Sequence, residues 1–185
     1  MRVGVIGVGH LGYHHARILR SLASEVTVFD VREARTAEVA SELGVAAASS
    51  ASELLSRVDA VVVASDTVTH HDVVMQALAA GCHTLVEKPI ASDSIQAAHL
   101  ASEAERLGLV LAVGHVERFN PAVVAAGALI DSPMFVEAHR LAPFKHRGID
   151  VSVVMDLMIH DIDLVLSFVR SPVSEVHASG VAVRA

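Results

Sequence analysis

Short runs of β-branched residues alternate with amphipathic, helix-length stretches along residues 1–119, and this alternation limits the possible folds more than any other feature. The runs are RVGVI at 2–6, EVTVF at 25–29, DAVVVA at 59–64, HTLVE at 83–87 and LVLAV at 109–113. Parallel strands must be joined by crossover connections, which are usually helices. The rhythm therefore predicts an α/β domain with a doubly wound parallel sheet that helices cover on both faces.

Helix boundaries within this region carry recognisable signals. Ser50 and Glu53 have the spacing of a capping box, and so do Asp93 and Gln96. Three glycines, Gly44, Gly81 and Gly108, are placed to end helices, because glycine readily adopts the left-handed backbone conformation found there. The Ala/Ser-rich run at 46–52 is expected to be a short connection.

The rhythm ends near Asn120-Pro121, where we expect a second domain, residues 120–185, to begin. Its expected elements are a helix at 122–130, a strand at 135–141, a helix at 151–169 and a strand at 176–183. Two helices and two strands are too few for an independent domain, and the last strand would expose an unpaired edge. We therefore expect an incomplete α+β domain in a truncated chain, or alternatively an edge that a partner subunit covers.

Charge and hydropathy exclude several classes of partner. The formal net charge of -7 leaves no basic surface that neutralises a run of phosphates, so nucleic acid is not expected as a partner. Every apolar stretch is interrupted by a charged residue, a glycine or a histidine before it reaches the roughly eighteen residues that a membrane-spanning helix needs. The N-terminus has no signal-peptide pattern, and the chain is expected to be soluble and cytoplasmic. Cys82, the single cysteine, has no disulfide partner and is expected to be a packing residue.

A glycine-rich turn follows the first expected strand and opens a helix. In the string GVGHLG, Gly7 permits a tight turn, Gly9 lets the backbone approach a pyrophosphate, and Gly12 lets helix and strand pack closely. The N-terminus of the helix then offers free N–H groups to the phosphates. In this strand–turn–helix context, the pattern is typical of a Rossmann dinucleotide-binding domain.

The end of the second expected strand adds a carboxylate to this site. Asp30 stands eighteen residues after Gly12 and is placed to accept hydrogen bonds from the adenosine ribose hydroxyls, while it would repel a 2′-phosphate. NAD is therefore favoured over NADP, although Arg32 and Arg35 lie just beyond and could soften the preference. His10, inside the turn, either contacts the cofactor or faces solvent.

Four strings in order resemble the Gfo/Idh/MocA family, named for glucose-fructose oxidoreductase and inositol dehydrogenase. They are Thr69-His70 at the start of a helix, Glu87-Lys88-Pro89 within AAGCHTLVEKPIA, GHVERFNP at 114–121 and DLMIHD at 156–161. The resemblance implies a two-domain NAD(P)-dependent oxidoreductase whose second domain is a largely antiparallel sheet. That sheet would hold the substrate against the nicotinamide and often forms the oligomer interface, so a homo-oligomer is expected. Members are longer than this chain, and ASDT at 64–67 stands where many have a Thr-Pro or Asn-Pro turn.

The resemblance also implies a cofactor contact set that extends beyond the glycine turn. The residues expected to contact NAD are Gly7, Gly9, His10, Leu11, Gly12, Asp30, Val31, Arg32, Ser65, Thr67, His70, Glu87 and Lys88.

Oxidation of a secondary alcohol needs a proton acceptor and a positive group near the hydroxyl. By analogy with the family, Lys88 would hydrogen-bond the reacting hydroxyl, and His160 would be the general base with Asp156 as its orienter or as a substrate ligand. Asp156 and His160 belong to a polar stripe with Asp163 and Ser167, which from periodicity alone favours the solvent face of an amphipathic helix. Asp161 lies on another face, where a structural role is expected.

Two arginines and an asparagine are candidates for substrate binding. Arg118 and Arg147 could bind a phosphate or carboxylate through forked hydrogen bonds, or form surface salt bridges, and Asn120 adds an amide. The sequence contains 12 histidines but no HExxH, and the adjacent pairs at 14–15 and 70–71 point apart on a helix, so no metal site is expected.

Within the family, the strings HVERFNPA and RLAPFKHRGIDVSVVMDLMIHDIDLVLS are most similar to members that act on UDP-N-acetylglucosamine. That similarity implies oxidation of the sugar C3 hydroxyl, with NAD as hydride acceptor. A free polyol such as an inositol is the alternative substrate. A non-catalytic NAD-binding regulatory protein is the alternative from another functional class.

Overall fold

The computed structural model describes residues 1–141, 151–169 and 171–181. Its first part is a six-stranded sheet in the order β3-β2-β1-β4-β5-β6, and every neighbouring pair of strands is parallel. The strands are β1 (Arg2–Ile6), β2 (Glu25–Phe29), β3 (Ala46–Ala47), β4 (Ala60–Val63), β5 (His83–Val86) and β6 (Leu111–Val113). The order reverses beside β1, which confirms the predicted doubly wound Rossmann sheet.

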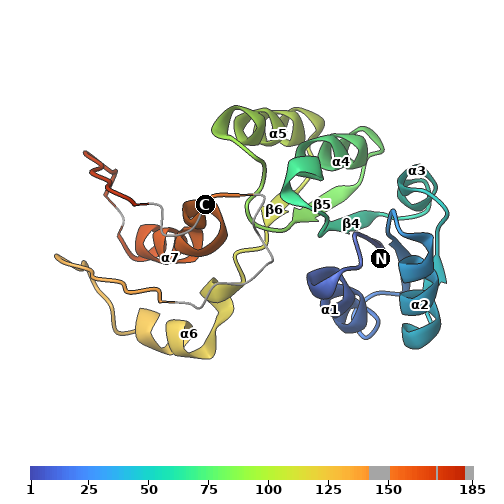
Figure 1. The fold of residues 1–185 in the computed structure, drawn as a ribbon, viewed down its shortest axis with the longest axis horizontal. Coiled ribbons are helices and arrows are strands. Elements are labelled where there is room, and N and C mark those ends of the chain that lie inside the picture. The colour runs from blue at the N-terminus through green and yellow to red at the C-terminus, as the bar shows by residue number, and fades with distance from the viewer. Residues whose placement is uncertain (142–150, 170, 182–185) are drawn as a thin grey trace.

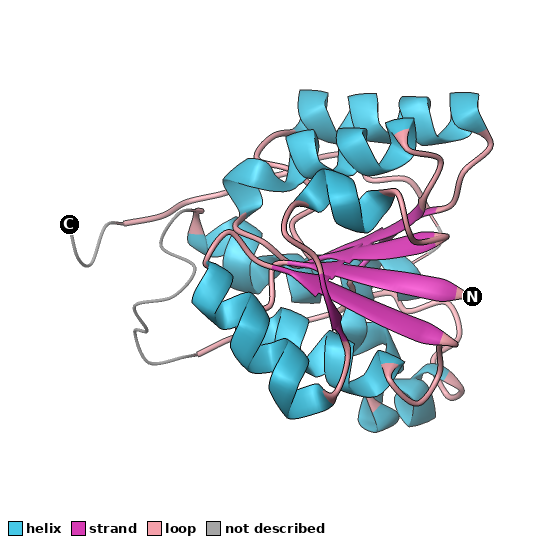
Figure 2. Cartoon of the chain, turned by 90° about the vertical axis from the view of Figure 1, so that its right-hand side faces the viewer, coloured by secondary structure: helices cyan, strands magenta, loops and turns pink. Residues whose placement is uncertain are grey.

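Helices lie on both sides of the sheet, as Figure 2 shows. Two separate hydrophobic clusters fill the two faces: α1 and α2 contribute to one, and α3, α4 and α5 to the other. The helices are α1 (His10–Leu19), α2 (Glu33–Leu43), α3 (Ala51–Leu55), α4 (Thr67–Ala79), α5 (Ser94–Leu107), the 3-10 turn η1 (Val116–Phe119) and α6 (Pro121–Gly127). None of the helices in the described ranges is long and apolar enough to cross a membrane.

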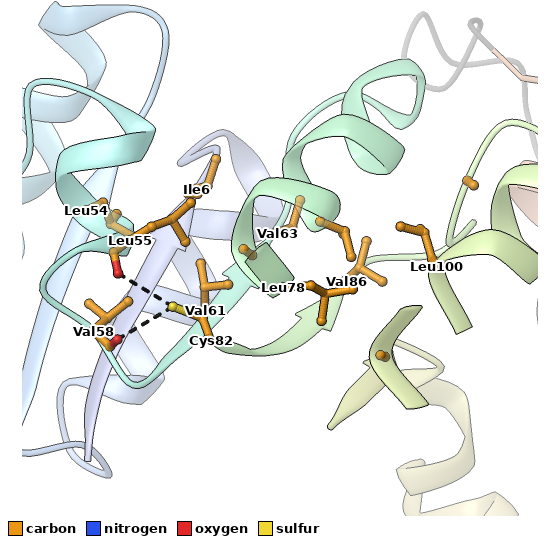
Figure 3. Packing of buried hydrophobic residues seen from close by; sticks show 14 of the residues in the cluster. Ile6, Leu54, Leu55, Val58, Val61, Val63, Leu78, Cys82, Val86 and Leu100 are labelled. Atoms are coloured by element: carbon orange, nitrogen blue, oxygen red, sulfur yellow. Dashed lines mark hydrogen bonds between the residues drawn. The ribbon is translucent and has the colours of Figure 1, made fainter. Parts of the chain in front are cut away.

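The central strands are buried on both faces, which explains their continuous apolar runs. In β1, Val5 packs toward α1 and α2, while the next residue, Ile6, packs toward α3 and α4. Figure 3 shows the second of these clusters, in which Leu54, Leu78 and Leu100 come from three different helices. The sheet therefore holds its helices by burying alternate side chains on opposite faces.

Cys82 lies inside the cluster of Figure 3, as expected for a packing residue. Its thiol donates weak hydrogen bonds to the carbonyls of Leu55 and Val58, both at 3.6 Å. Burial raises the pKa of the Cys82 thiol, so this side chain is not an activated nucleophile.

Helix ends agree with their sequence signals. The Ser50 hydroxyl accepts a hydrogen bond from the backbone N–H of Glu53, and the Asp93 carboxylate accepts from the backbone N–H groups of Ile95 and Gln96. Left-handed glycines end two helices, with φ of 63° at Gly44 after α2 and 67° at Gly108 after α5.

One connection has more structure than its composition indicates. The run at 46–52, predicted as a plain connection, contains β3 and the start of α3. Ala46 and Ala47 pair with Thr27 and Val28 of β2. A two-residue strand at the sheet edge is too short to show an alternating pattern, so only the pairing reveals it.

Two predicted strands do not form among the described residues of the second part of the chain. Residues 135–141 form no strand, and neither do 171–181; the remainder of the strand predicted at 176–183 lies outside the described residues. Strand propensity is not sufficient, because a strand needs a neighbour for its backbone hydrogen bonds, and these two segments do not pair. The large side chains of Phe135 and Leu141 are accordingly exposed.

The predicted helix at 151–169 is present in two portions. A π-helical turn, η2 (Val154–Met158), leads directly into α7 (Ile159–Phe168). Figure 1 shows α6 and α7 together beside β6, on the side away from α2 and α3. In the described part of the chain after residue 120, the helical segments α6, η2 and α7 therefore lie next to the carboxyl ends of β5 and β6.

Truncation of a buried side chain on α4 should destabilise the sheet domain. We expect Leu78→Ala to lower the free energy of unfolding by about 2–5 kcal/mol, because Leu78 is 1% exposed and its removal leaves a cavity. Val68→Ala on the same helix is the matched control, since Val68 is 63% exposed and its loss should change stability by less than about 0.5 kcal/mol. Urea unfolding measures both, and equal effects would contradict the assigned core.

Candidate active site at the carboxyl ends of the strands

The three glycines of the first turn have three different structural roles. Gly7 has a φ of 83°, and a Cβ there would lie 2.7 Å from the backbone of Ala64. A Cβ on Gly12 would lie 1.8 Å from the Gly7 carbonyl oxygen, so no larger residue fits between α1 and β1. A Cβ on Gly9 would meet nothing within 4 Å. The first two glycines serve the protein's own packing, whereas the third leaves open space above the backbone.

That space lies at the N-terminus of α1. No side chain caps this helix, whose first turn leaves backbone N–H groups without helical partners. His10 and Leu11, the first two residues of α1, are exposed at the same place. An open backbone at Gly9 beside uncapped N–H groups fits a pyrophosphate, so the turn is suited to hold a dinucleotide.

Asp30, predicted to bind the adenosine ribose, also forms hydrogen bonds that fix the glycine turn. Its carboxylate accepts hydrogen bonds from the backbone N–H of Val8 at 3.0 Å and from the backbone N–H of Arg32 at 3.0 Å. Burial opposes ionisation of this carboxyl, but the hydrogen bonds from Arg32 and Val8 outweigh it and hold the pKa of Asp30 below its ordinary value. Asp30 is therefore an anion at the end of β2, anchored to the glycine turn.

The neighbouring residues are placed differently from one another. The Arg32 guanidinium lies on Asp30, with Nε 3.1 Å from Oδ1, and most of its side chain is exposed. Arg35 donates from Nε to the Val8 carbonyl at 2.8 Å and pairs with Glu38, so it is occupied by the protein. Val31, which precedes Arg32, is 90% exposed. Arg32 is thus the cation closest to the carboxylate that would face the adenosine ribose.

The turn after β4 is held by a buried histidine. His70, 1% exposed, lies between two carbonyl oxygens: Nδ1 is 2.8 Å from Pro89 O and Nε2 is 3.0 Å from Ser65 O. Thr67 begins α4 and is also buried. His70 therefore connects the turn after β4 to the turn after β5. Because both ring nitrogens of His70 contact protein carbonyls, a cofactor contact near β4 has to come from the turn that begins at Ser65.

Glu87, directly after β5, belongs to a pair that the sequence did not reveal. Its carboxylate, 7% exposed, accepts a hydrogen bond from His15 Nε2 on α1 at 2.7 Å. A Cβ on Gly114 would lie 2.9 Å from the same carboxylate, so β6 approaches it closely. The only sequence signal for His15 was its place in an adjacent histidine pair. The pair links the helix of the glycine turn to the strand end that carries Lys88.

Lys88 and Asp156 meet although 68 residues separate them. Lys88 Nζ donates to the Asp156 carbonyl oxygen at 2.7 Å and to its carboxylate Oδ1 at 3.0 Å. Asp156 lies in the π-helical turn η2, a feature that is frequent at functional sites. The lysine is mostly buried and the carboxylate one-third exposed, so the contact lies at the rim of the sheet's carboxyl edge.

His160 lies one turn beyond Asp156, on α7. Burial lowers the pKa of this imidazole, and the positive charges of Lys88 and Arg140 lower it further. Its Nδ1 atom is buried without a hydrogen-bond partner. A half-buried, neutral imidazole near a lysine is a suitable proton acceptor at neutral pH.

Two ion pairs hold α7 to the preceding segments. Arg118 Nε donates to Asp163 Oδ2 at 2.7 Å, and Arg140 Nε donates to Asp161 Oδ2 at 2.6 Å. His115 Nδ1 lies 3.7 Å from Asp163 Oδ1. Asp161 thus has the structural role that was expected of it, and Asp163, predicted only as part of a polar stripe, is a buried anchor.

The remaining predicted substrate residues are only partly described. Asn120 caps α6 by accepting from the backbone N–H of Ala122 at 3.0 Å, and its amide donates to Glu117 at 3.1 Å. Arg147 lies outside the described residues. Among residues 1–141, 151–169 and 171–181, no group of three or more His, Cys, Asp or Glu side chains is arranged to hold a metal ion.

The family model for the oxidoreductase family with an NAD-binding Rossmann fold, Gfo/Idh/MocA, matches residues 1–115. The chain belongs to this family. The family is described as NAD-binding, which agrees with NAD as the cofactor expected from the glycine turn.

Curated and solved relatives extend the similarity to the rest of the chain. The chain is 46% identical to UDP-N-acetylglucosamine 3-dehydrogenase from Acidithiobacillus ferrooxidans, over 98% of this chain and 58% of that protein. The solved structure of the same enzyme matches with a TM-score of 0.92 over the same shares. An inositol 2-dehydrogenase from Rubrobacter xylanophilus is 35% identical over 96% of this chain and 55% of its own length. This Gfo/Idh/MocA chain therefore spans little more than half the length of its relatives.

Substitution of the glycines should separate folding from cofactor binding. Gly12→Ala places a Cβ against the Gly7 carbonyl and should lower the thermal unfolding temperature. Gly9→Ala has open space and should keep the stability of the parent while weakening NADH binding at least tenfold, because the methyl group occupies the expected path of the pyrophosphate. Fluorescence titration with NADH and thermal unfolding measure the two effects. Unchanged NADH affinity in Gly9→Ala would contradict the assigned site.

Proposed function

We propose that this chain is the cofactor-binding and catalytic part of an NAD-dependent oxidoreductase that oxidises a secondary hydroxyl of a nucleotide sugar to a ketone. The observation that carries the proposal is the contact between Lys88 and Asp156, with His160 one turn away. It joins an ammonium, a carboxylate and a neutral imidazole at the strand ends, beside the glycine turn. The 46% identity to UDP-N-acetylglucosamine 3-dehydrogenase supports that sugar nucleotide as substrate, with C3 as the oxidised position.

The residues proposed to hold NAD surround the carboxyl edge of the sheet. They are Gly7, Gly9, His10, Leu11 and Gly12 of the first turn, Asp30, Val31 and Arg32 after β2, Ser65, Thr67 and His70 after β4, and Glu87 and Lys88 after β5. NAD would supply the acceptor for the hydride that leaves the alcohol carbon. His70 and Glu87 are occupied by protein contacts, so we propose that they act by positioning the turns at which NAD binds.

Lys88 is proposed to bind the reacting hydroxyl. An ammonium has three N–H donors, and Asp156 accepts two of them, which leaves one for a substrate oxygen. The fixed positive charge would stabilise negative charge that develops on the oxygen as its proton leaves. Asp156 therefore orients Lys88, whereas the sequence had indicated it as an orienter of His160 or a ligand of the substrate.

His160 is proposed to take the hydroxyl proton. Burial and the nearby cations keep the imidazole neutral at neutral pH, so its free nitrogen can accept a proton. Arg118 is proposed to bind a phosphate oxygen of the nucleotide sugar, because half of its side chain remains exposed while it is paired with Asp163. Asn120 and Arg147 remain proposed substrate contacts from the adjoining segments.

An inositol is the second candidate substrate, since several inositol 2-dehydrogenases are similar over most of this chain. The two candidates differ in charge: a nucleotide sugar brings a diphosphate that needs cations, and a free polyol does not. Half of the Arg118 guanidinium side chain is exposed beside the proposed site, which favours the nucleotide sugar.

Residues 1–119 and 120–185 are proposed as the cofactor domain and part of the substrate domain. Leu129, Phe135 and Leu141 are exposed in the second part, which supports a further apolar surface, either more of the substrate domain or a second copy, against it. We propose a homo-oligomer that forms through this region. The proposed substrate and cofactor are cytoplasmic metabolites, and we place the enzyme in the cytoplasm.

Turnover assays on the protein encoded by the complete gene test the function. NAD reduction at 340 nm should be faster with UDP-N-acetylglucosamine than with myo-inositol. Lys88→Ala should lower kcat by about 10² or more while NADH binding stays intact, because the lysine acts on the reacting hydroxyl. Arg106→Ala, which removes an ion pair with Glu103 on α5, is the control and should leave kcat unchanged. Binding of NADH without turnover of any sugar or polyol, unaffected by Lys88→Ala, would instead support a regulatory NAD-binding protein.

The pH profile tests the proposed base. The pKa of His160 is lowered from 6.5 by burial and by the charges of Lys88 and Arg140, and only the neutral imidazole accepts a proton. We expect kcat/KM to be constant above the ordinary histidine pKa and to fall as the pH drops through a value below 6.5. His160→Gln should abolish this acid limb together with most of the activity. An acid limb that persists in the variant would assign it to another group.

A further inference from the structure

Within the part of the chain that the structure describes, two imidazole nitrogens are buried without hydrogen-bond partners, and they belong to His115 and His160. They are Nδ1 of His115, which precedes η1, and Nδ1 of His160 on α7. Buried polar atoms are nearly always hydrogen-bonded, so two unpaired nitrogens at one place call for a functional explanation. His160 has a role in the proposed reaction, whereas His115 has none so far.

Asp163 connects His115 to the rest of the site. Its carboxylate is 9% exposed and lies between the Arg118 guanidinium, 2.7 Å away, and His115 Nδ1, 3.7 Å away. The hydrogen bond from Arg118 outweighs the opposing effect of burial and holds the pKa of Asp163 below its ordinary value, and interactions with His115 and His160 add to it. A fixed anion therefore faces the Nδ1 side of the His115 ring.

The surroundings of His160 disfavour a charge on balance. Burial, Lys88, Arg140 and His115 lower the pKa of His160 and outweigh the acidic groups that favour its charged form, which are Glu117, Asp161 and Asp163. A proton that His160 takes from a substrate is therefore in an unfavourable place. The proton has to leave His160 before the next turnover. The carboxylate of Asp163 lies beside the imidazole of His115, 3.7 Å from its Nδ1 atom.

We propose that His115 is a proton-relay residue, which receives the substrate's proton from His160 and passes it toward solvent. The proposal rests on the proposed dehydrogenase function. In the relay, neutral His160 carries its hydrogen on Nδ1 and accepts the hydroxyl proton at Nε2. The Nδ1–H bond then breaks, and that proton binds Nε2 of His115 through one bridging water, while His115 Nδ1–H faces Asp163.

The step is balanced without another reactant. The alcohol loses a hydride from carbon, which NAD accepts, and a proton from oxygen, which His160 accepts. The proton then moves from His160 to His115 and finally to water, so both imidazoles return to their neutral forms. Asp163 stays ionised and acts as a positioning residue for His115.

Chemical rescue tests the relay in the complete protein. His115→Ala should lower kcat in dilute, weakly basic buffer by about tenfold, less than the 10²–10⁴ of a group that meets the substrate proton directly. Added imidazole should restore the rate in proportion to its concentration in this variant and leave the parent unchanged. His99→Ala, which removes an exposed histidine on α5, is the matched control and should show neither loss nor rescue. A rate loss in His115→Ala that imidazole does not restore, or no loss, would overturn the relay.

Nitrogen NMR titration of the histidine side chains gives a second readout that needs no turnover. In His115→Gln, which keeps a polar side chain of similar length, the titration midpoint of His160 should rise, because a neighbouring positive charge is gone. An unchanged midpoint would show that the two rings are not coupled and would overturn the relay. If the parent oxidises no sugar, the proposed function fails, and this titration still decides whether the rings are coupled. If the parent is active and both tests are negative, only the relay fails.

Discussion

The close approach of α1 to β1 is the constraint on which the rest of this site depends. A Cβ at residue 12 would lie 1.8 Å from the Gly7 carbonyl, so helix and strand touch through their backbones. This contact sets the N-terminus of α1 above the open backbone of Gly9. It also brings His15, on the same helix, within 2.7 Å of Glu87 at the end of β5. The glycine turn and the strand end that carries Lys88 are thereby held as one unit.

The second part of the chain is joined to this unit by charged side chains. Asp156, Asp161 and Asp163 follow one another along η2 and α7, and each binds a cation from another segment: Lys88, Arg140 and Arg118 respectively. Partly buried pairs of this kind contribute little to stability, because removal of the charges from water offsets their attraction. They do specify position, since each carboxylate meets its cation in one arrangement. The helix that carries His160 is therefore located relative to the cofactor turn by electrostatics as well as by packing.

Much of the Rossmann domain was predictable because its signals are local. The runs at 2–6 and 25–29 became strands with the predicted bounds, and the caps at Ser50 and Asp93 formed as their spacing indicated. The strand predicted at 135–141 did not form, nor did the described part of the strand predicted at 176–183, because strand pairing is decided by a neighbour that local propensity does not supply. Glu87 and His70 were predicted as cofactor contacts from a family motif, yet both are engaged by protein groups 72 and 19 residues away.

By itself, the sequence determined the strand–turn–helix unit, its glycine requirements and the family, since these depend on backbone conformation and on residues close together in the chain. The tertiary structure alone decided that Lys88 binds Asp156, that His15 binds Glu87, and that His115 and His160 lie near one buried carboxylate. The first two contacts join residues that are far apart in the chain, with separations of 68 residues for Lys88 and Asp156 and 72 for His15 and Glu87. The physical reason is that side-chain chemistry sets what a residue can bind, whereas packing of the sheet and its helices sets what comes within reach.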